Sequence, residues 1–138
     1  MLKTPIIHPG LLAALGKCGH KGQILIADSN YAYSSNVNNN AEIVYLNLAP
    51  GLIDAQNVLK KVLECINVES ATMMQAPVDF DNVTERSYRE ILGKEIPIDF
   101  LERYAFYDKV KSDATSLVIA TGETRRFANI ILTVGVVK

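Results

Sequence analysis

The chain has 138 residues, a length typical of one domain and sufficient to bury a core without disulfides or metal ions. Hydrophobic residues make up 49% and charged residues 21% of the chain, which excludes a disordered protein and a coiled coil. Fourteen Lys and Arg residues against fifteen Asp and Glu residues give a net charge of -1 without a basic block, so we expect no nucleic-acid partner.

The elements alternate between helical and extended patterns. Residues 23–27 are almost continuously apolar, which is typical of a strand covered on both faces. After Pro50, apolar residues fall on one helical stripe between Leu52 and Ile66. In chain order we predict a helix over 8–15, a strand over 23–27, a polar loop over 33–40, a strand over 42–48, a helix over 52–66, a strand over 71–74, a helix capped by Asn82, an ambiguous strand-then-helix stretch over 98–111, and strands over 116–121 and 130–136.

This order predicts an α/β fold. We expect residues 1–138 to form a single-domain three-layer α/β/α sandwich with a mostly parallel sheet. The last two strands, 116–121 and 130–136, have no helix between them, so we expect them to pair with each other as an antiparallel C-terminal strand pair.

Cys18 and Cys65 lie far apart in the chain and outside any CxxC or Cys/His cluster, so we expect two reduced, buried thiols and no structural zinc site. The sequence has no apolar signal core at its N-terminus and no run of about 18 apolar residues. We therefore expect a cytoplasmic protein with no membrane partner.

Two residues flank the first strand. Asp28 follows the strand, at the end where open α/β sheets bind ligands, and His20 precedes it. The two side chains are thus a strand length apart, unless a neighbouring subunit or a loop brings them together. The spacing alone favours a capping or surface role for His20, whereas Asp28 is either a site residue or a turn carboxylate. We expect His8, which precedes Pro9, to be structural.

One further segment has the residue types of a sugar site. Arg103-Tyr-Ala-Phe-Tyr107 combines a guanidinium with aromatic faces, which together bind the hydroxyls and the apolar ring patch of a sugar. The alternative is an ordinary amphipathic segment. The sequence contains neither GxGxxG nor GxxxxGK[ST], so nucleotide binding has no motif.

Taken together, the motifs resemble the RbsD/FucU family of L-fucose mutarotases and D-ribose pyranases. The resemblance runs in order along almost the whole chain. The matching pieces are Ile7-His8-Pro9, Gly19-His20, Ile24 to Asn30, Met73-Met74, Glu85 to Arg89, Arg103 to Tyr107, Thr121-Gly-Glu123, and Phe127 through Leu132 to Gly135-Val136.

The resemblance implies a ring-shaped homo-oligomer, typically a decamer, with each site at a subunit boundary, a monosaccharide substrate, and no metal or organic cofactor. It implies that His20 is the catalytic proton donor. It further implies that Asp28, Arg103 and the Phe127-Ala128-Asn129 segment bind the sugar.

The chain departs from the family at two of these places. Lys21-Gly22 follows His20 where an acidic residue is usual, and Phe127 replaces a tyrosine. Arginine at position 103 is the fucose-type pattern, so we predict interconversion of the α and β anomers of L-fucose or a similar six-carbon sugar. D-ribose pyranase activity is one alternative. A non-catalytic sugar-binding or transport-associated module is another, and the altered turn after His20 favours it.

Overall fold

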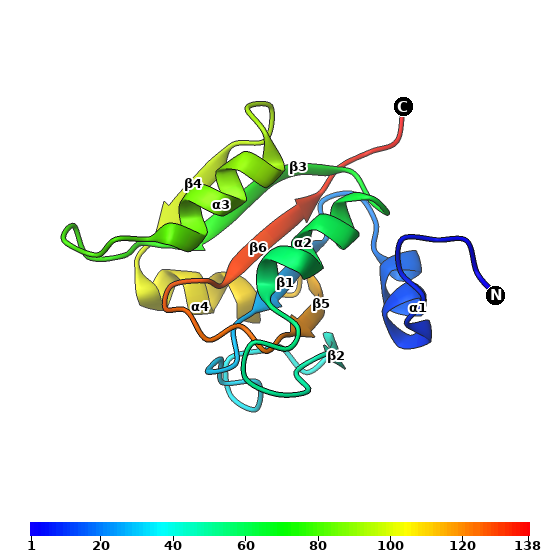
Figure 1. Ribbon diagram of the computed structural model, residues 1–138, viewed down its shortest axis with the longest axis horizontal. Coiled ribbons are helices and arrows are strands. Elements are labelled where there is room, and N and C mark those ends of the chain that lie inside the picture. Colours follow the sequence, from blue (N-terminus) through cyan, green and yellow to red (C-terminus); the bar gives the residue numbers. More distant parts are fainter.

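A computed structural model describes residues 1–138. The chain forms four helices and six strands, and the strands make one sheet with the order β2-β5-β1-β6-β3-β4 (Figure 1). In chain order the elements are α1 (Pro9–Lys17), β1 (Gln23–Ala27), β2 (Glu42–Tyr45), α2 (Ala55–Leu63), β3 (Val68–Met74), α3 (Val83–Leu92), β4 (Ile98–Leu101), α4 (Arg103–Lys111), β5 (Thr115–Ala120) and β6 (Ile130–Val134). The ambiguous stretch over 98–111 is therefore a strand followed by a helix.

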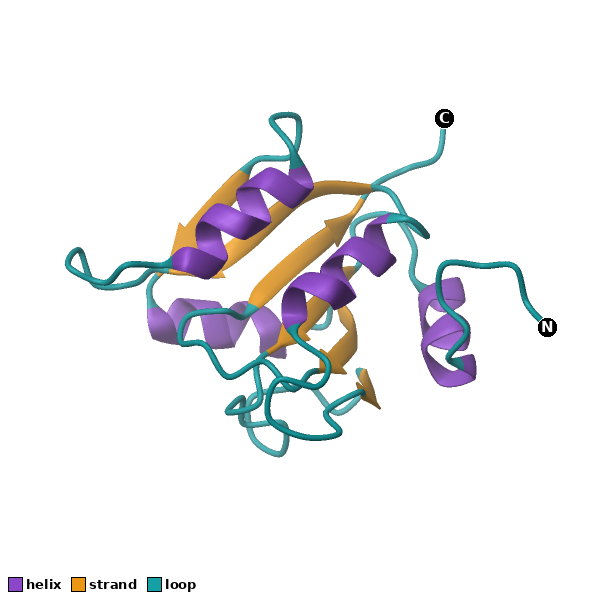
Figure 2. Ribbon diagram, viewed as in Figure 1, coloured by secondary structure: helices purple, strands orange, loops and turns teal.

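Helices cover both faces of the sheet. Apolar side chains of α1, α2 and α3 form one core with one face of the strands, and the other face packs against α4. Figures 1 and 2 show α2 and α3 in front of the sheet and α4 behind it. All five residues of β1 are buried, as its apolar run predicts. The predicted three-layer α/β/α fold is confirmed.

The sheet is mixed because β6 runs antiparallel to both of its neighbours, β1 and β3. The prediction that β5 and β6 pair with each other is wrong, because β1 lies between them. A connection of two to five residues favours a hairpin, whereas the segment 121–129 is long enough to cross the end of one strand. The segment crosses the carboxyl end of β1 and is held there by hydrogen bonds, including one of 2.8 Å from the Ser29 N–H to the Glu123 carbonyl.

Side-chain caps define where the helices start. The Asn82 side chain accepts from the Glu85 N–H at 3.1 Å and begins α3, as predicted. The His8 Nδ1 accepts from the Leu11 N–H at 3.0 Å, which confirms that His8 is structural. Helix α2 begins later than its apolar stripe predicts, because Asp54 caps it and Leu52 lies in the preceding turn.

Gly122 allows that turn to pack against the sheet. A Cβ atom at this position would lie 2.4 Å from the Leu52 carbonyl oxygen and 2.5 Å from that of Ala49. The two segments are joined by hydrogen bonds, from the Gly122 N–H to Ile53 and from the Gly51 N–H to the Gly122 carbonyl. A side chain at position 122 would therefore displace the turn.

The two cysteines are free, but they are not buried as expected. Cys65 is exposed just after α2, and Cys18 is partly buried at the end of α1. None of the helices combines the length and the apolar character needed to cross a membrane.

Candidate functional site

The candidate site is a cavity at one edge of the sheet. The parallel strands β1, β3 and β4 end at this edge, and β6 begins there because it runs the opposite way. The cavity has a volume of about 240 Å³, which suits a ligand smaller than a typical drug molecule. It is lined by Asp28, Asn30, Tyr31, Met74, Arg103, Tyr107, Arg126, Phe127 and Asn129. Sequence position alone places Asp28 here, as predicted.

Asp28 is held rigidly at the cavity wall. Its backbone N–H donates to the Asn129 Oδ1 at 2.7 Å, and the Asn129 Nδ2 donates back to the Asp28 Oδ2 at 3.0 Å. The Asn30 N–H donates to the other carboxylate oxygen at 3.0 Å. Burial raises the pKa of Asp28, and these hydrogen bonds oppose the rise. Each oxygen keeps acceptor capacity for a ligand hydroxyl.

The segment 127–129 lies beside Asp28, and its Phe127 and Asn129 line the cavity. Phe127 has a φ of 56°, a left-handed conformation that is costly for a bulky residue, and its ring packs edge-on against Phe80 at 5.0 Å. Ala128 is completely buried and does not line the cavity. Its carbonyl accepts from the Tyr88 hydroxyl at 2.7 Å, so this residue anchors the loop. Burial raises the pKa of Tyr88, which keeps the phenol protonated as a donor.

Arg103 is the first residue of α4, directly after β4, and its side chain borders the cavity. It forms no ion pair, so its five N–H donors are available to a ligand. Tyr107, one turn along the same helix, packs edge-on against Tyr31 at 5.9 Å and completes an aromatic side of the cavity. Burial raises the pKa of Tyr31, whose hydroxyl donates to the Asn36 carbonyl at 2.7 Å.

His20 lies at the other end of the sheet. It precedes β1, whose five residues place its two ends roughly 16 Å apart. Its Nε2 lies 3.2 Å from the Glu69 Oε2, and Lys21 pairs with the other oxygen of the same carboxylate. The hydrogen bond from Lys21 is the main reason that the pKa of Glu69 is lowered. One chain therefore does not bring His20 to the cavity.

Residues 1–137 match the model of the RbsD / FucU transport protein family. The chain belongs to this family. Similar solved structures include Bacillus subtilis RbsD complexed with D-ribose (26% identity, TM-score 0.87) and the fucose mutarotase in complex with L-fucose from Streptococcus pneumoniae (27% identity, TM-score 0.84), each with both chains covered in full. FucU from Bifidobacterium longum is 31% identical over 96% of each chain, with a TM-score of 0.80. RbsD and FucU relatives are thus about equally similar to this family member.

Sequence reasoning missed five residues of this RbsD / FucU chain as site residues. Four of them border the cavity, and the fifth, Glu69, contacts His20; the four are Asn30, Tyr31, Met74 and Arg126. Met74 could have been found because it ends a predicted strand at the same edge as Asp28. Nothing local indicates Glu69, because its contact joins segments 49 residues apart.

Glu123 supports the cavity without lining it. Its carboxylate is 2% exposed and accepts from Arg125 Nε at 2.8 Å and Nη2 at 2.7 Å. Burial works to raise the pKa of Glu123, but the hydrogen bonds from Arg125 and from the Ala55 N–H outweigh it, so the pKa is lowered. No group of three or more His, Cys, Asp or Glu side chains is arranged to hold a metal ion.

Proposed function

We propose that this protein is a monosaccharide mutarotase that interconverts the α and β anomers of L-fucose or a similar six-carbon sugar. The observation that carries the proposal is the pairing of acceptor and donor in one cavity. Asp28, fixed by Asn129, accepts hydrogen bonds from sugar hydroxyls, and Arg103 donates to them. The Phe127 ring offers an apolar face to the sugar ring.

The reaction needs one proton donor placed at the ring oxygen. Protonation of that oxygen breaks its bond to the anomeric carbon while the anomeric hydroxyl loses a proton to water, which yields the open-chain aldehyde. Rotation about the adjacent carbon–carbon bond and reclosure on the other face give the second anomer. A histidine side chain both gives and takes a proton near neutral pH, and we assign this role to His20.

His20 must then come from a second copy of the chain. Its ring is about half exposed and lies a full strand length from the cavity of its own chain. Large apolar side chains are exposed on the segment 45–53, with Tyr45 at 59%, Leu48 at 85% and Leu52 at 56% exposure, which favours burial against another copy. We propose a homo-oligomer, a decamer as in the resemblance, with each site at a subunit boundary.

Two observations bear on the identity of the sugar, and each favours a different one. Arg103 is the fucose-type residue, which favours L-fucose. The solved structure of B. subtilis RbsD complexed with D-ribose has a TM-score of 0.87 to this chain, which supports D-ribose pyranase activity as the second candidate.

Two-dimensional exchange or saturation-transfer NMR on the anomeric protons tests both candidates. L-fucose, D-ribose and D-galactose are compared with and without the protein at neutral pH. We expect the fastest exchange for L-fucose. Accelerated exchange of D-ribose alone would assign the protein to the pyranases. Binding without acceleration of any sugar would contradict the enzyme and leave the non-catalytic sugar-binding module.

A further inference from the structure

Two arginine side chains border the same cavity, and neither has an acidic partner. Arg103 and Arg126 both line it, and the eight ion pairs of the chain include neither of them. By contrast, the neighbouring Arg125 is fully engaged with Glu123. The proposed function uses Arg103 as the donor to sugar hydroxyls and gives Arg126 no role.

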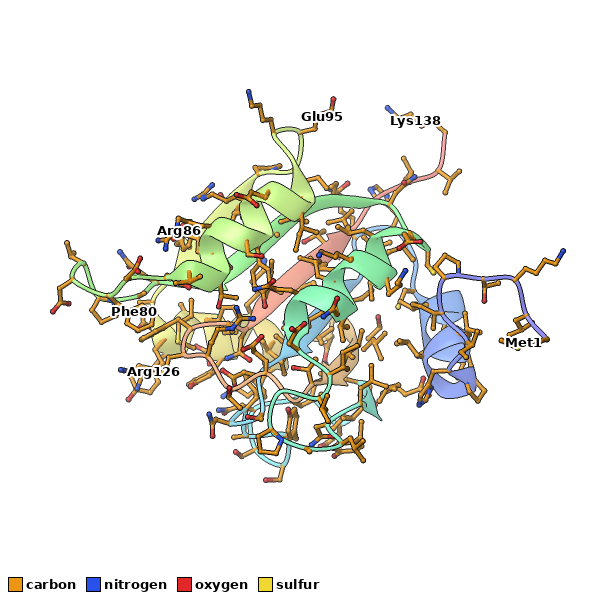
Figure 3. All side chains as sticks on the ribbon, in the orientation of Figure 1. Met1, Phe80, Arg86, Glu95, Arg126 and Lys138 are labelled. Atoms are coloured by element: carbon orange, nitrogen blue, oxygen red, sulfur yellow. The ribbon has the colours of Figure 1, made fainter.

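Arg126 is oriented by aromatic rings rather than by a carboxylate. Its guanidinium carbon lies 5.5 Å from the centre of the Phe80 ring and 5.3 Å from that of Phe127. Figure 3 shows Arg126 and Phe80 at the same end of the molecule. Stacking on ring faces holds a guanidinium in place while its N–H groups at the edge stay free to donate.

Within one chain, the side chains that line the cavity therefore carry a net positive charge, although the whole chain carries a net charge of -1. Asp28 is the only carboxylate that lines it, and the Asn30 N–H and the Asn129 amide already bond its oxygens. Two guanidinium groups and one carboxylate thus line the cavity, and that carboxylate already accepts hydrogen bonds from the protein. Guanidinium donors bind carboxylate and phosphate oxygens more strongly than they bind hydroxyls.

We propose that the cavity also takes monosaccharides that carry an anionic group, a carboxylate or a phosphate, which Arg126 binds together with Arg103. The inference deepens the proposed function, since it takes the cavity to be the sugar site. Arg126 is then the residue that extends binding from neutral to acidic sugars.

The test compares matched neutral and anionic sugars by isothermal titration calorimetry on the full-length protein. D-galactose is paired with D-galacturonate and D-galactose 6-phosphate, and D-ribose with D-ribose 5-phosphate. We expect at least one anionic sugar to bind about tenfold more tightly than its neutral partner, with an advantage that shrinks as salt is added. Which of the anionic sugars binds distinguishes a carboxylate from a phosphate ligand.

Arg126→Gln should remove most of the extra affinity for anionic sugars. Because the side chain at position 126 is exposed, we expect the variant to fold like the parent protein. Arg89→Gln is the matched control, because Arg89 also lies over a phenylalanine ring, Phe100 at 5.6 Å, but outside the cavity. Anionic sugars that bind no more tightly than neutral ones overturn the inference, as does an advantage that survives Arg126→Gln.

Anomer exchange, measured on the same samples, separates the two proposals. Accelerated exchange of neutral sugars without any preference for anions leaves the mutarotase standing and removes the role of Arg126. Tight, Arg126-dependent binding of anionic sugars without accelerated exchange of any sugar supports the inference and contradicts the mutarotase.

Discussion

The Oε2 atom of Glu69 lies 3.2 Å from the Nε2 atom of His20, and this contact joins the start of β3 to the turn before β1. The local sequence after His20 lacks an acidic residue, and Glu69 supplies the carboxylate from another strand. When the Nε2–H donates to Glu69, the neutral ring carries its lone pair on Nδ1. Nδ1 is then the nitrogen left for a substrate in the proposed mechanism: it donates a proton to the ring oxygen from the imidazolium and accepts one back in the neutral ring.

Glu69→Ala should slow anomer exchange about tenfold while the affinity for sugar stays the same. The reason is that the side chain orients the imidazole without touching the cavity, much as hydrogen-bond partners orient metal-bound histidines. Glu64→Ala, which removes another exposed glutamate paired with a lysine, is the control. The exchange rate by NMR and the affinity by calorimetry are measured for both variants. An unaltered exchange rate in Glu69→Ala would show that the contact with His20 has only a structural role.

His20→Ala should reduce anomer exchange by roughly two to four orders of magnitude, the usual contribution of one acid–base group. Its melting temperature should change little, because the ring is about half exposed. His8→Ala should do the opposite, since His8 caps α1 and its loss costs about 0.5–2 kcal/mol of stability. Equal exchange rates for His20→Ala and the parent protein would remove His20 from the mechanism.

Co-expression of two impaired variants, assayed at a sugar concentration well below the dissociation constant of Arg103→Ala, tests whether each site needs two chains. If His20 acts in a neighbour's cavity, random assembly of His20→Ala and Arg103→Ala subunits leaves roughly a quarter of the sites intact. We expect activity to return to about that fraction of the parent protein's. A chain that carries both substitutions should stay inactive. Failure of the mixture to recover, or a fully active 15 kDa monomer by light scattering, would contradict the shared site.

Arg103→Ala should weaken sugar binding by about one to two orders of magnitude, because hydrogen bonds from a charged donor contribute about 1.5–3 kcal/mol. Stability should be nearly unchanged, since the side chain is exposed and unpaired. Lys109→Ala removes a cation from the last turn of the same helix and should leave the dissociation constant unaffected. A parent-like constant in Arg103→Ala would make Arg103 an ordinary surface charge.

Glu123 should make stability depend on pH in acid. Its pKa is lowered in the folded protein from the ordinary 4.5, so the stabilisation is fully present above about pH 4.5 and is lost as the pH falls through the folded value. Glu123→Gln should lose roughly 1.5–3 kcal/mol at pH 7 and show a weaker dependence on pH in acid.

Urea unfolding between pH 3 and 7 measures the free energy of unfolding at each pH. Glu90→Gln, at an exposed position, is the control. Asp28 contributes with the opposite sign because burial raises its pKa, and the charge of Glu123 adds to that rise, so Glu123→Gln also reduces the Asp28 contribution. If the free energy of unfolding depends on pH in the same way in Glu123→Gln and the parent protein, the Glu123–Arg125 pair is not the cause of the loss of stability in acid.

Several features follow from the sequence alone because each depends on a few neighbouring residues. The apolar run of β1 and the Asn82 cap of α3 are local patterns, and both appear where they were predicted. Asp28 at the carboxyl end of β1 follows from the same local pattern together with the general geometry of α/β sheets. These features also place the cavity at the correct edge.

Only the tertiary structure decided which distant segments meet. The position of β6 beyond β1, the contact of Glu69 with His20 and the entry of Arg126 into the cavity all depend on the strand order. That order reflects the burial of apolar faces summed over the whole chain, and no single segment encodes it. The same reason applies to the separation of His20 from Asp28, which strand β1 sets within one chain and which a second copy closes in the proposed shared site.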